Sequence, residues 1–421
     1  MTGSIVRISR LLMIAASLIC AMAASAPAED SSPDLATLAT WPHLTDDWFG
    51  VRKSLADRGI TFDISFSVDA TKNVRGGLDT AGSAWRTLFD PSVELDLKPL
   101  IGLEGGTAYG EFQWAQGPNA SDELIGDVQG INNNDGVPGA EHQNRTQIAQ
   151  LWYQQTAFGE ALRVKVGKVD ANSEFDHSQF AGDFLNQSYG SSATLFTLPT
   201  YPDNAFGINV FLKPVKDLRL AFGVYDGSLA NGVRTGSMGP DPFFHDHDLF
   251  LIGEIDKSWT LGPDQLAGRL AVGGWYSTNK FPRLDGGETS GTGGPYVLLD
   301  QSVWRANPKD DDDARGVGVF VMWGYADPSI LAFDHSFGGG VAWTGPLAHR
   351  PTDVAGIGVQ AVHFSQDFHA SADFEINYEL FYRLQLTPWL AIKPDLQYIS
   401  NPGGNGTPDA LAVTVRLQFN F

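Results

Sequence analysis

Acidic and basic side chains recur at even spacing in the segment 374–386. Glu375, Glu379 and Arg383 occupy alternate positions, so they share one face if the segment is extended. Carboxylates accept hydrogen bonds and guanidinium groups donate them, so such a face can bind the hydroxyl groups of a polar solute. Two carboxylates also suggest acid–base catalysis on a glycosidic bond. Positions four apart on a strand lie about 13 Å apart, however, which exceeds the carboxylate spacing of glycosidases.

The segment that carries these residues is predicted to be a β-strand with one polar and one apolar face. Apolar residues from Phe374 to Leu386 alternate strictly with the positions between them, most of which are polar. Helical spacing does not produce this period of two. The segment 411–421 repeats the pattern and ends in Phe421. A final strand of this kind is typical of a barrel in the outer membrane.

The same alternation predicts sixteen strands, an even number, as single-chain bacterial barrels require. Short connections such as 387–389 alternate with long ones such as 116–144 and 171–204, which matches periplasmic turns and external loops. The predicted fold class is therefore all-β: a 16-stranded antiparallel transmembrane β-barrel with a short N-terminal helix. The predicted strands are 60–69, 89–97, 104–115, 145–155, 160–170, 205–213, 217–226, 246–256, 266–278, 294–304, 315–326, 338–344, 355–364, 374–386, 390–399 and 410–421.

The N-terminal region has the pattern of a secretory signal peptide. Two arginines precede the apolar segment 11–24, and small residues follow it up to Ala28. That segment is too short to anchor a protein across a bilayer. We expect cleavage between Ala26 and Ala28. The predicted division is a signal peptide at 1–28, a periplasmic segment at 29–59 with a helix at 46–58, and the barrel at 60–421.

Composition excludes several classes of function. The chain has 421 residues, a net charge of −21 and one cysteine, Cys20, which lies inside the predicted signal peptide. Disulfide scaffolds and cysteine chemistry are therefore excluded, and so strong a negative charge argues against binding to nucleic acid. The run Asn132–Gly136 faintly resembles a calcium loop but lacks its closing glutamate, so a turn is the better interpretation. No metal site and no cofactor are expected.

Strand parity predicts which side chains face the lumen. These residues carry both charges, and a lumen of mixed sign suits a neutral polar solute better than an ion. The alternative interpretation is a hydrated wall without a specific role. The pore-lining candidates are Glu94, Glu111, Arg163, Lys165, Arg219, Arg269, Trp275, Glu375, Glu379, Arg383 and Asp395.

The loop 171–204 is the main candidate for a constriction. A long loop in a compact wall is usually functional or disordered, and this one is rich in aromatic residues that folding into the channel would bury. The constriction candidates are Phe175, Asp176, Asp183 and Asn186.

Several short motifs follow one another in a fixed order along 48–421. They are Trp48-Phe49-Gly50-Val51-Arg52, Gly167-Lys168-Val169-Asp170, Tyr225-Asp226-Gly227, Gly274-Trp275-Tyr276, Arg350-Pro351 with Asp353, Glu375 with Tyr378-Glu379 and Tyr382, Pro394-Asp395-Leu396-Gln397-Tyr398 and Asn401-Pro402-Gly403-Gly404. Together they resemble the carbohydrate-selective porins of the OprB family. The resemblance implies a sixteen-stranded outer-membrane barrel that passes monosaccharides, typically glucose, by facilitated diffusion.

The expected function is passive, carbohydrate-selective diffusion across the bacterial outer membrane, with no enzymatic activity. The expected partners are a monosaccharide, outer-membrane lipid and lipopolysaccharide, and the oligomeric state, monomer or trimer, stays open. A general non-selective porin is the first alternative. A secreted carbohydrate-binding β-sandwich is a more distant one.

Overall fold

The computed structural model describes residues 35–139, 144–238 and 247–421. The chain divides into two compact units, Met1–Thr40 and Trp41–Phe421. The first unit contains helix α2 (Leu35–Leu38), and the predicted signal peptide lies outside the described residues. The second unit contains every strand of the barrel.

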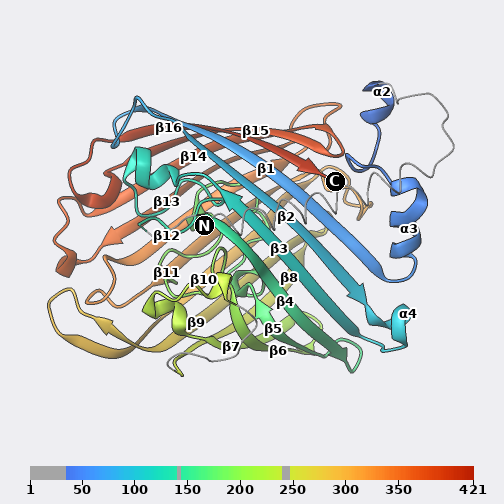
Figure 1. Cartoon of the computed structure of the whole chain (residues 1–421), viewed down its shortest axis with the longest axis horizontal. Coiled ribbons are helices and arrows are strands. Elements are labelled where there is room, and N and C mark those ends of the chain that lie inside the picture. The colour runs from blue at the N-terminus through green and yellow to red at the C-terminus, as the bar shows by residue number, and fades with distance from the viewer. Residues whose placement is uncertain (1–34, 140–143, 239–246) are drawn as a thin grey trace, which may run out of the picture. The chain divides into compact units, whose positions relative to one another are not determined.

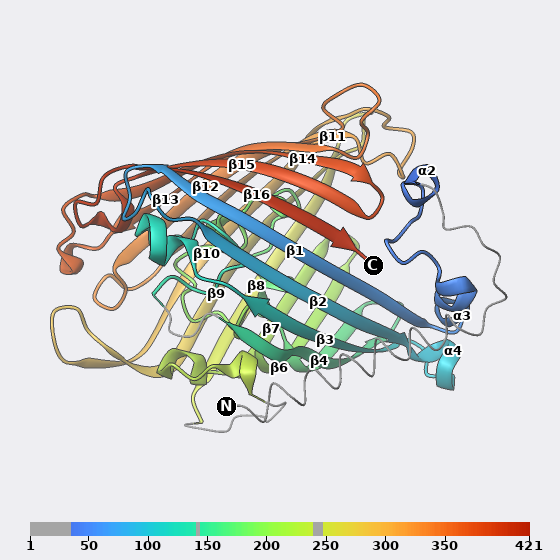
Figure 2. The same cartoon turned by 45° about the horizontal axis from the view of Figure 1, so that its top comes forward.

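Sixteen antiparallel strands form a closed barrel (Figures 1 and 2), as the alternation predicted. Each strand pairs with its neighbours in chain order, and the first pairs with the last. The strands are β1 (Ile60–Arg75), β2 (Ala84–Asp96), β3 (Gly106–Gln116), β4 (Arg145–Ala157), β5 (Leu162–Val169), β6 (Ala205–Val215), β7 (Leu218–Asp226), β8 (Leu249–Leu261), β9 (Leu266–Pro282), β10 (Glu288–Arg305), β11 (Gly316–Tyr325), β12 (Phe333–Thr344), β13 (Val354–Phe364), β14 (Phe374–Thr387), β15 (Leu390–Ser400) and β16 (Ala410–Asn420).

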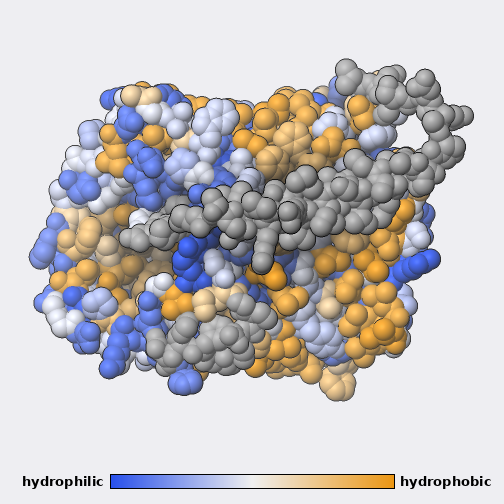
Figure 3. All heavy atoms as spheres, in the orientation of Figure 1, coloured by the Kyte–Doolittle hydropathy of each residue, from blue (hydrophilic) through white to orange (hydrophobic). Residues whose placement is uncertain are grey.

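The outward face of the barrel is apolar, whereas the inward face carries the buried charged and polar side chains together with aromatic residues that pack under the loops. On β14, Tyr378 and Leu380 are about half exposed, whereas Glu375 and Glu379 are buried. Apolar side chains form broad areas over the strands on the face seen in Figure 3. This is the pattern of a wall that faces lipid outside and polar groups inside. Separately, no helix among the described residues combines the length and hydropathy needed to cross a membrane.

A short helical segment lies where the barrel closes. It consists of η1 (Trp48–Gly50) and α3 (Val51–Ala56), which is shorter than the predicted helix at 46–58. Arg52 donates hydrogen bonds to the carbonyl oxygens of Phe62, at 3.3 Å, and Phe421, at 2.5 Å. The segment is thereby attached to β1 and to the end of the chain.

The connections differ at the two ends of the barrel. At one end they are mostly turns, with the helix α4 (Leu97–Ile101) between β2 and β3. The predicted strands 266–278 and 294–304 implied a long loop at 279–293, and this prediction is wrong. β9 extends to Pro282, β10 begins at Glu288, and these two residues pair in a hairpin. Several other loops at the same end as this hairpin carry single helical turns: η2 (Ser121–Ile125), η3 (Ala171–Ser173), η4 (Gln187–Tyr189), η5 (Ser228–Asn231), η6 (Thr235–Ser237), η7 (Gln366–Phe368) and η8 (Pro402–Gly404).

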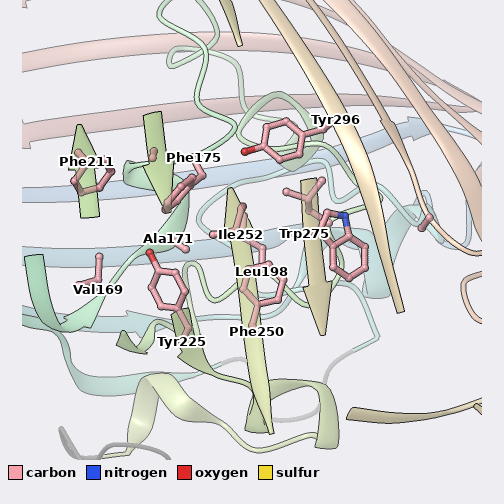
Figure 4. Packing of buried hydrophobic residues seen from close by; sticks show 13 residues of the cluster. Val169, Ala171, Phe175, Leu198, Phe211, Tyr225, Phe250, Ile252, Trp275 and Tyr296 are labelled. Carbon is pink, nitrogen blue, oxygen red and sulfur yellow. The ribbon is translucent and has the colours of Figure 1, made fainter. Parts of the chain in front are cut away.

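The main hydrophobic core lies between the loop 171–204 and the inner wall (Figure 4). The ring centroid of Phe175 is 6.1 Å from that of Phe211 on β6. Trp275 on β9 stacks against Phe250, at 6.0 Å, and meets Phe196 of the loop edge-on, at 5.5 Å. The aromatic residues of the loop are thus buried against inward-facing side chains, which fixes the loop inside the barrel.

Glycines on the inner face of β11–β13 make room for these aromatic rings. A Cβ atom built on Gly358 would lie 2.6 Å from the Tyr189 hydroxyl and 2.8 Å from the ring of Phe184. A Cβ atom built on Gly340 would lie 2.8 Å from the ring of Phe320 on β11. The glycine-rich sequence of these strands therefore provides space for the loop.

We expect Gly358→Ala to destabilise the barrel by about 1–3 kcal/mol, because overpacking forces Phe184 and Tyr189 away from the wall. Thermal unfolding in detergent measures the change. Gly274→Ala is the matched control, because its Cβ would point to the outer face and lie 3.6 Å from the nearest atom. An equal loss of stability in Gly358→Ala and Gly274→Ala would contradict this account.

Candidate functional site

Glu174, just after η3, connects the long loop to two basic residues of β5. Its carboxylate accepts hydrogen bonds from Arg163, at 2.7 and 2.9 Å, and lies 2.5 Å from the Lys165 ammonium group. The Arg163 guanidinium also lies 3.6 Å from the ring centroid of Phe211. Bidentate pairing and stacking on a ring hold this arginine in one orientation.

A second charged array lies on the adjoining inner wall, where two arginines flank two acidic residues of β8. Arg219 donates to Glu254 at 2.5 Å and to Asp256 at 2.6 Å. Arg269 donates to the same carboxylates, at 3.3 and 2.5 Å. Both guanidinium groups also bond to backbone carbonyls of the loop, those of Glu174 and His177. The array therefore carries nearly balanced charge and supports the loop.

A cavity of about 400 Å³ opens beside this array. Lys213, Lys216 and Asp217 of β6 and the turn after it line one side of the cavity. The rest of its charged and polar lining comes from the loop, β7, β8 and β9 and includes Glu174, His177, Gln179, Arg219, Asp256 and Arg269. Donors and acceptors alternate over a few ångströms, which suits a solute with many hydroxyl groups. Within the described ranges, no three His, Cys, Asp or Glu side chains are grouped to hold a metal ion.

The charge states of Glu174 and His177 in the loop follow from the groups around them. Burial would raise the pKa of Glu174, but the hydrogen bonds from Arg163 and the charge of Lys165 hold it below its ordinary value. Burial and the nearby Arg269 lower the pKa of His177. At neutral pH the loop therefore presents a carboxylate and a neutral imidazole to the cavity.

The predicted constriction residue Asp183 lies near two basic residues of the opposite wall. Its carboxylate is 3.4 Å from Arg383 on β14 and 3.9 Å from Lys393 on β15. Lys393 also donates to the backbone oxygen of Asp183, at 2.6 Å. Arg383 and Asp183 both keep about a quarter of their side-chain surface exposed, so they can meet solvent in the lumen.

The run 132–135 forms a turn, and its asparagines bind a wall carboxylate. The backbone N–H of Asn134 donates to the side chain of Asn132, at 3.0 Å. The side chains of both asparagines donate to Asp69 on β1, at 2.9 Å. The run therefore attaches the loop 116–144 to the strand at which the barrel closes.

Burial separates the predicted lining residues into two groups. Solvent still reaches Glu94, Arg163, Arg219, Arg269 and Arg383. The other lining candidates are nearly or fully covered: Trp275, Glu375, Glu379 and Asp395 are at most 4% exposed, and Glu111 and Lys165 at most 9%. The constriction candidates Phe175, Asp176 and Asn186 are also at most 4% exposed. Such burial argues against direct contact between these side chains and a solute. Parity identified the inward face correctly, but the two long loops cover much of it.

Four acidic residues of the site were missing from the sequence-based candidates. Glu254 and Asp256 on β8 and Asp300 on β10 face inward, and the parity of those strands would have found them. Glu174 lies in an irregular loop, where the sequence carries no periodic signal.

Comparison with known proteins identifies the family. The family model described as "Carbohydrate-selective porin, OprB family" matches residues 84–421. The chain belongs to the OprB family of carbohydrate-selective porins. It is 27% identical to Porin B of Pseudomonas aeruginosa over 89% of this chain and 90% of that protein.

Solved structures show the same fold. The high-pH structure of Pseudomonas putida OprB aligns over 91% of this chain and 99% of that chain, with 22% identity and a TM-score of 0.82. The low-pH structure of that protein covers the same shares, with 19% identity and a TM-score of 0.58. The family and the closed barrel imply a channel of the bacterial outer membrane rather than an enzyme. The closed barrel also rules out the β-sandwich alternative.

Proposed function

We propose that this OprB-family porin is a passive channel that prefers monosaccharides, with glucose as the expected substrate. The supporting observation is the balanced array of Arg219, Arg269, Glu254 and Asp256 beside the cavity. The guanidinium groups of Arg219 and Arg269, which stay partly exposed, can donate to sugar hydroxyls. Glu254 and Asp256 are covered and act by balancing the charge of the two arginines. Because the opposite charges offset each other, the array offers an ion little net attraction.

The size of the cavity supports a small solute. The cavity volume of about 400 Å³ lies at the small end of the range for small-molecule sites. The loop 171–204 and the described part of the loop 116–144 pack against the inner wall and would narrow the lumen around the cavity. The proposed transport is passive, so the solute would move down its concentration gradient.

Liposome swelling tests the proposal. Purified protein is reconstituted, and swelling rates are compared for glucose, a disaccharide and an amino acid smaller than glucose. We expect glucose to enter faster than both. If rates simply follow solute size, with the amino acid ahead of glucose, the channel is a general porin and the proposed selectivity is wrong.

A further inference from the structure

Two glutamates of β14 hold both inward loops. On Glu379, one carboxylate oxygen accepts from the backbone N–H of Leu185, at 2.5 Å, and the other from that of Asn186, at 3.0 Å. Both residues belong to the loop 171–204. The Glu379 carboxyl group thus binds the loop through two backbone N–H groups, and the side chain of Asp395 is its further hydrogen-bond partner.

Glu375, four residues earlier on the same face, holds the other loop. Its carboxylate accepts from the backbone N–H groups of Val128, at 3.0 Å, and Gln129, at 3.2 Å. It also accepts from the backbone of Gly403 in the last loop, at 2.7 Å. Three separate parts of the chain therefore meet at this one carboxylate.

The two loops are also joined to each other. Asn133 donates its backbone N–H to Leu185, at 2.7 Å, and Gln187 donates to Gly130, at 2.8 Å. The Gln187 side chain bonds to the carbonyl oxygens of Asn132, at 3.1 Å, and Gly136, at 3.0 Å. We call the residues 127–136 and 183–189 the loop partition.

We propose that Glu375 and Glu379 are positioning residues that set the size limit of the channel by fixing the loop partition. The inference rests on the proposed function, because a size limit matters only for a channel that selects small sugars. Neither glutamate needs to touch the solute, since both are at most 1% exposed. They act through the backbone of the loops.

The chemistry requires a carboxylate at these positions. Both oxygens of Glu379 act as acceptors for N–H donors. A glutamine of the same shape has only one acceptor oxygen, and its NH2 group would face an N–H donor that it cannot accept. Leaving the buried N–H of Leu185 or Asn186 without an acceptor should raise the population of an open partition about tenfold.

The test compares solute entry in Glu379→Gln, Gln187→Ala and Glu288→Gln. Gln187→Ala weakens the partition from the loop side without changing charge. Glu288→Gln is the matched control, because it removes the same charge from an exposed residue at the start of β10. The readouts are the ratio of disaccharide to glucose swelling rates and heat-dependent gel mobility, which checks folding.

We expect Glu379→Gln to raise the disaccharide-to-glucose ratio about tenfold, Gln187→Ala to raise it less, and Glu288→Gln to leave it unchanged. A wild-type ratio in folded Glu379→Gln overturns the inference. If Glu379→Gln does not fold, Gln187→Ala decides in the same way. The wild-type comparison of glucose with the amino acid tests the proposed function separately, so the two failures can be distinguished.

Discussion

Replacing Arg416 with methionine is expected to destabilise the barrel by about 3–5 kcal/mol, because it leaves a buried carboxylate without its cation. Arg416 on β16 and Asp69 on β1 are paired residues where the barrel closes. Their two hydrogen bonds are 2.7 and 2.8 Å long, and Asp69 is fully buried. Asn132 and Asn134 also donate to Asp69, so the loop 116–144 depends on the same carboxylate.

Denaturant unfolding in detergent, followed by tryptophan fluorescence, measures this loss. Asp69→Asn combined with Arg416→Met is the matched control, because it removes both charges. We expect the double variant to recover most of the stability, since a buried pair often contributes little once both partners are replaced. If the double variant is no more stable than Arg416→Met, the unpaired charge of Asp69 is not the cause of the destabilisation.

Replacing Arg219 and Arg269 together with glutamine is expected to turn the channel into one that prefers cations. The substitution leaves Glu254 and Asp256 without the guanidinium groups that bond to them. Unbalanced carboxylates in a narrow, low-dielectric passage concentrate cations, so we expect the cation-to-anion permeability ratio to rise about tenfold. The reversal potential in a KCl gradient across a planar bilayer measures this ratio.

The matched control removes one charge of each sign from the same array. Arg269→Gln combined with Asp256→Asn keeps the net charge of the lumen and should leave the reversal potential close to that of the wild type. Heat-dependent gel mobility confirms that both variants are folded, which matters because Arg219 and Arg269 also bond to the loop backbone. An unchanged reversal potential in the Arg219/Arg269 variant would show that this array does not control permeation.

The strands were predictable because their signal is local. Alternation between lipid-facing and lumen-facing positions repeats every second residue, so a strand with clear alternation can be recognised without knowledge of its neighbours. The prediction was wrong at 279–293, where β9 and β10 form a hairpin with 17-residue and 18-residue strands. We attribute this error to the end of the hairpin. Its strands need no apolar outward face there, so the sequence lacks the alternation that identifies the other strands.

The role of individual inward residues was less predictable. Arg219 and Arg269 were chosen by parity and do lie beside the cavity. Glu375 and Glu379 were chosen by the same rule, yet loop backbone covers both. Their bonds to Leu185 and Val128 span 194 and 247 residues of the chain, and strand periodicity contains no information about such contacts.

The sequence by itself determined the closed, sixteen-stranded wall and the direction in which each strand side chain points, because both follow from a period of two and an apolar environment outside. Tertiary structure alone decided which inward residues stay open to the lumen. That outcome depends on where the loops 116–144 and 171–204 pack, on glycines such as Gly358 that make room for them, and on the carboxylates that bind their backbone. These are contacts between distant parts of the chain, and they form only once the barrel has brought its walls together.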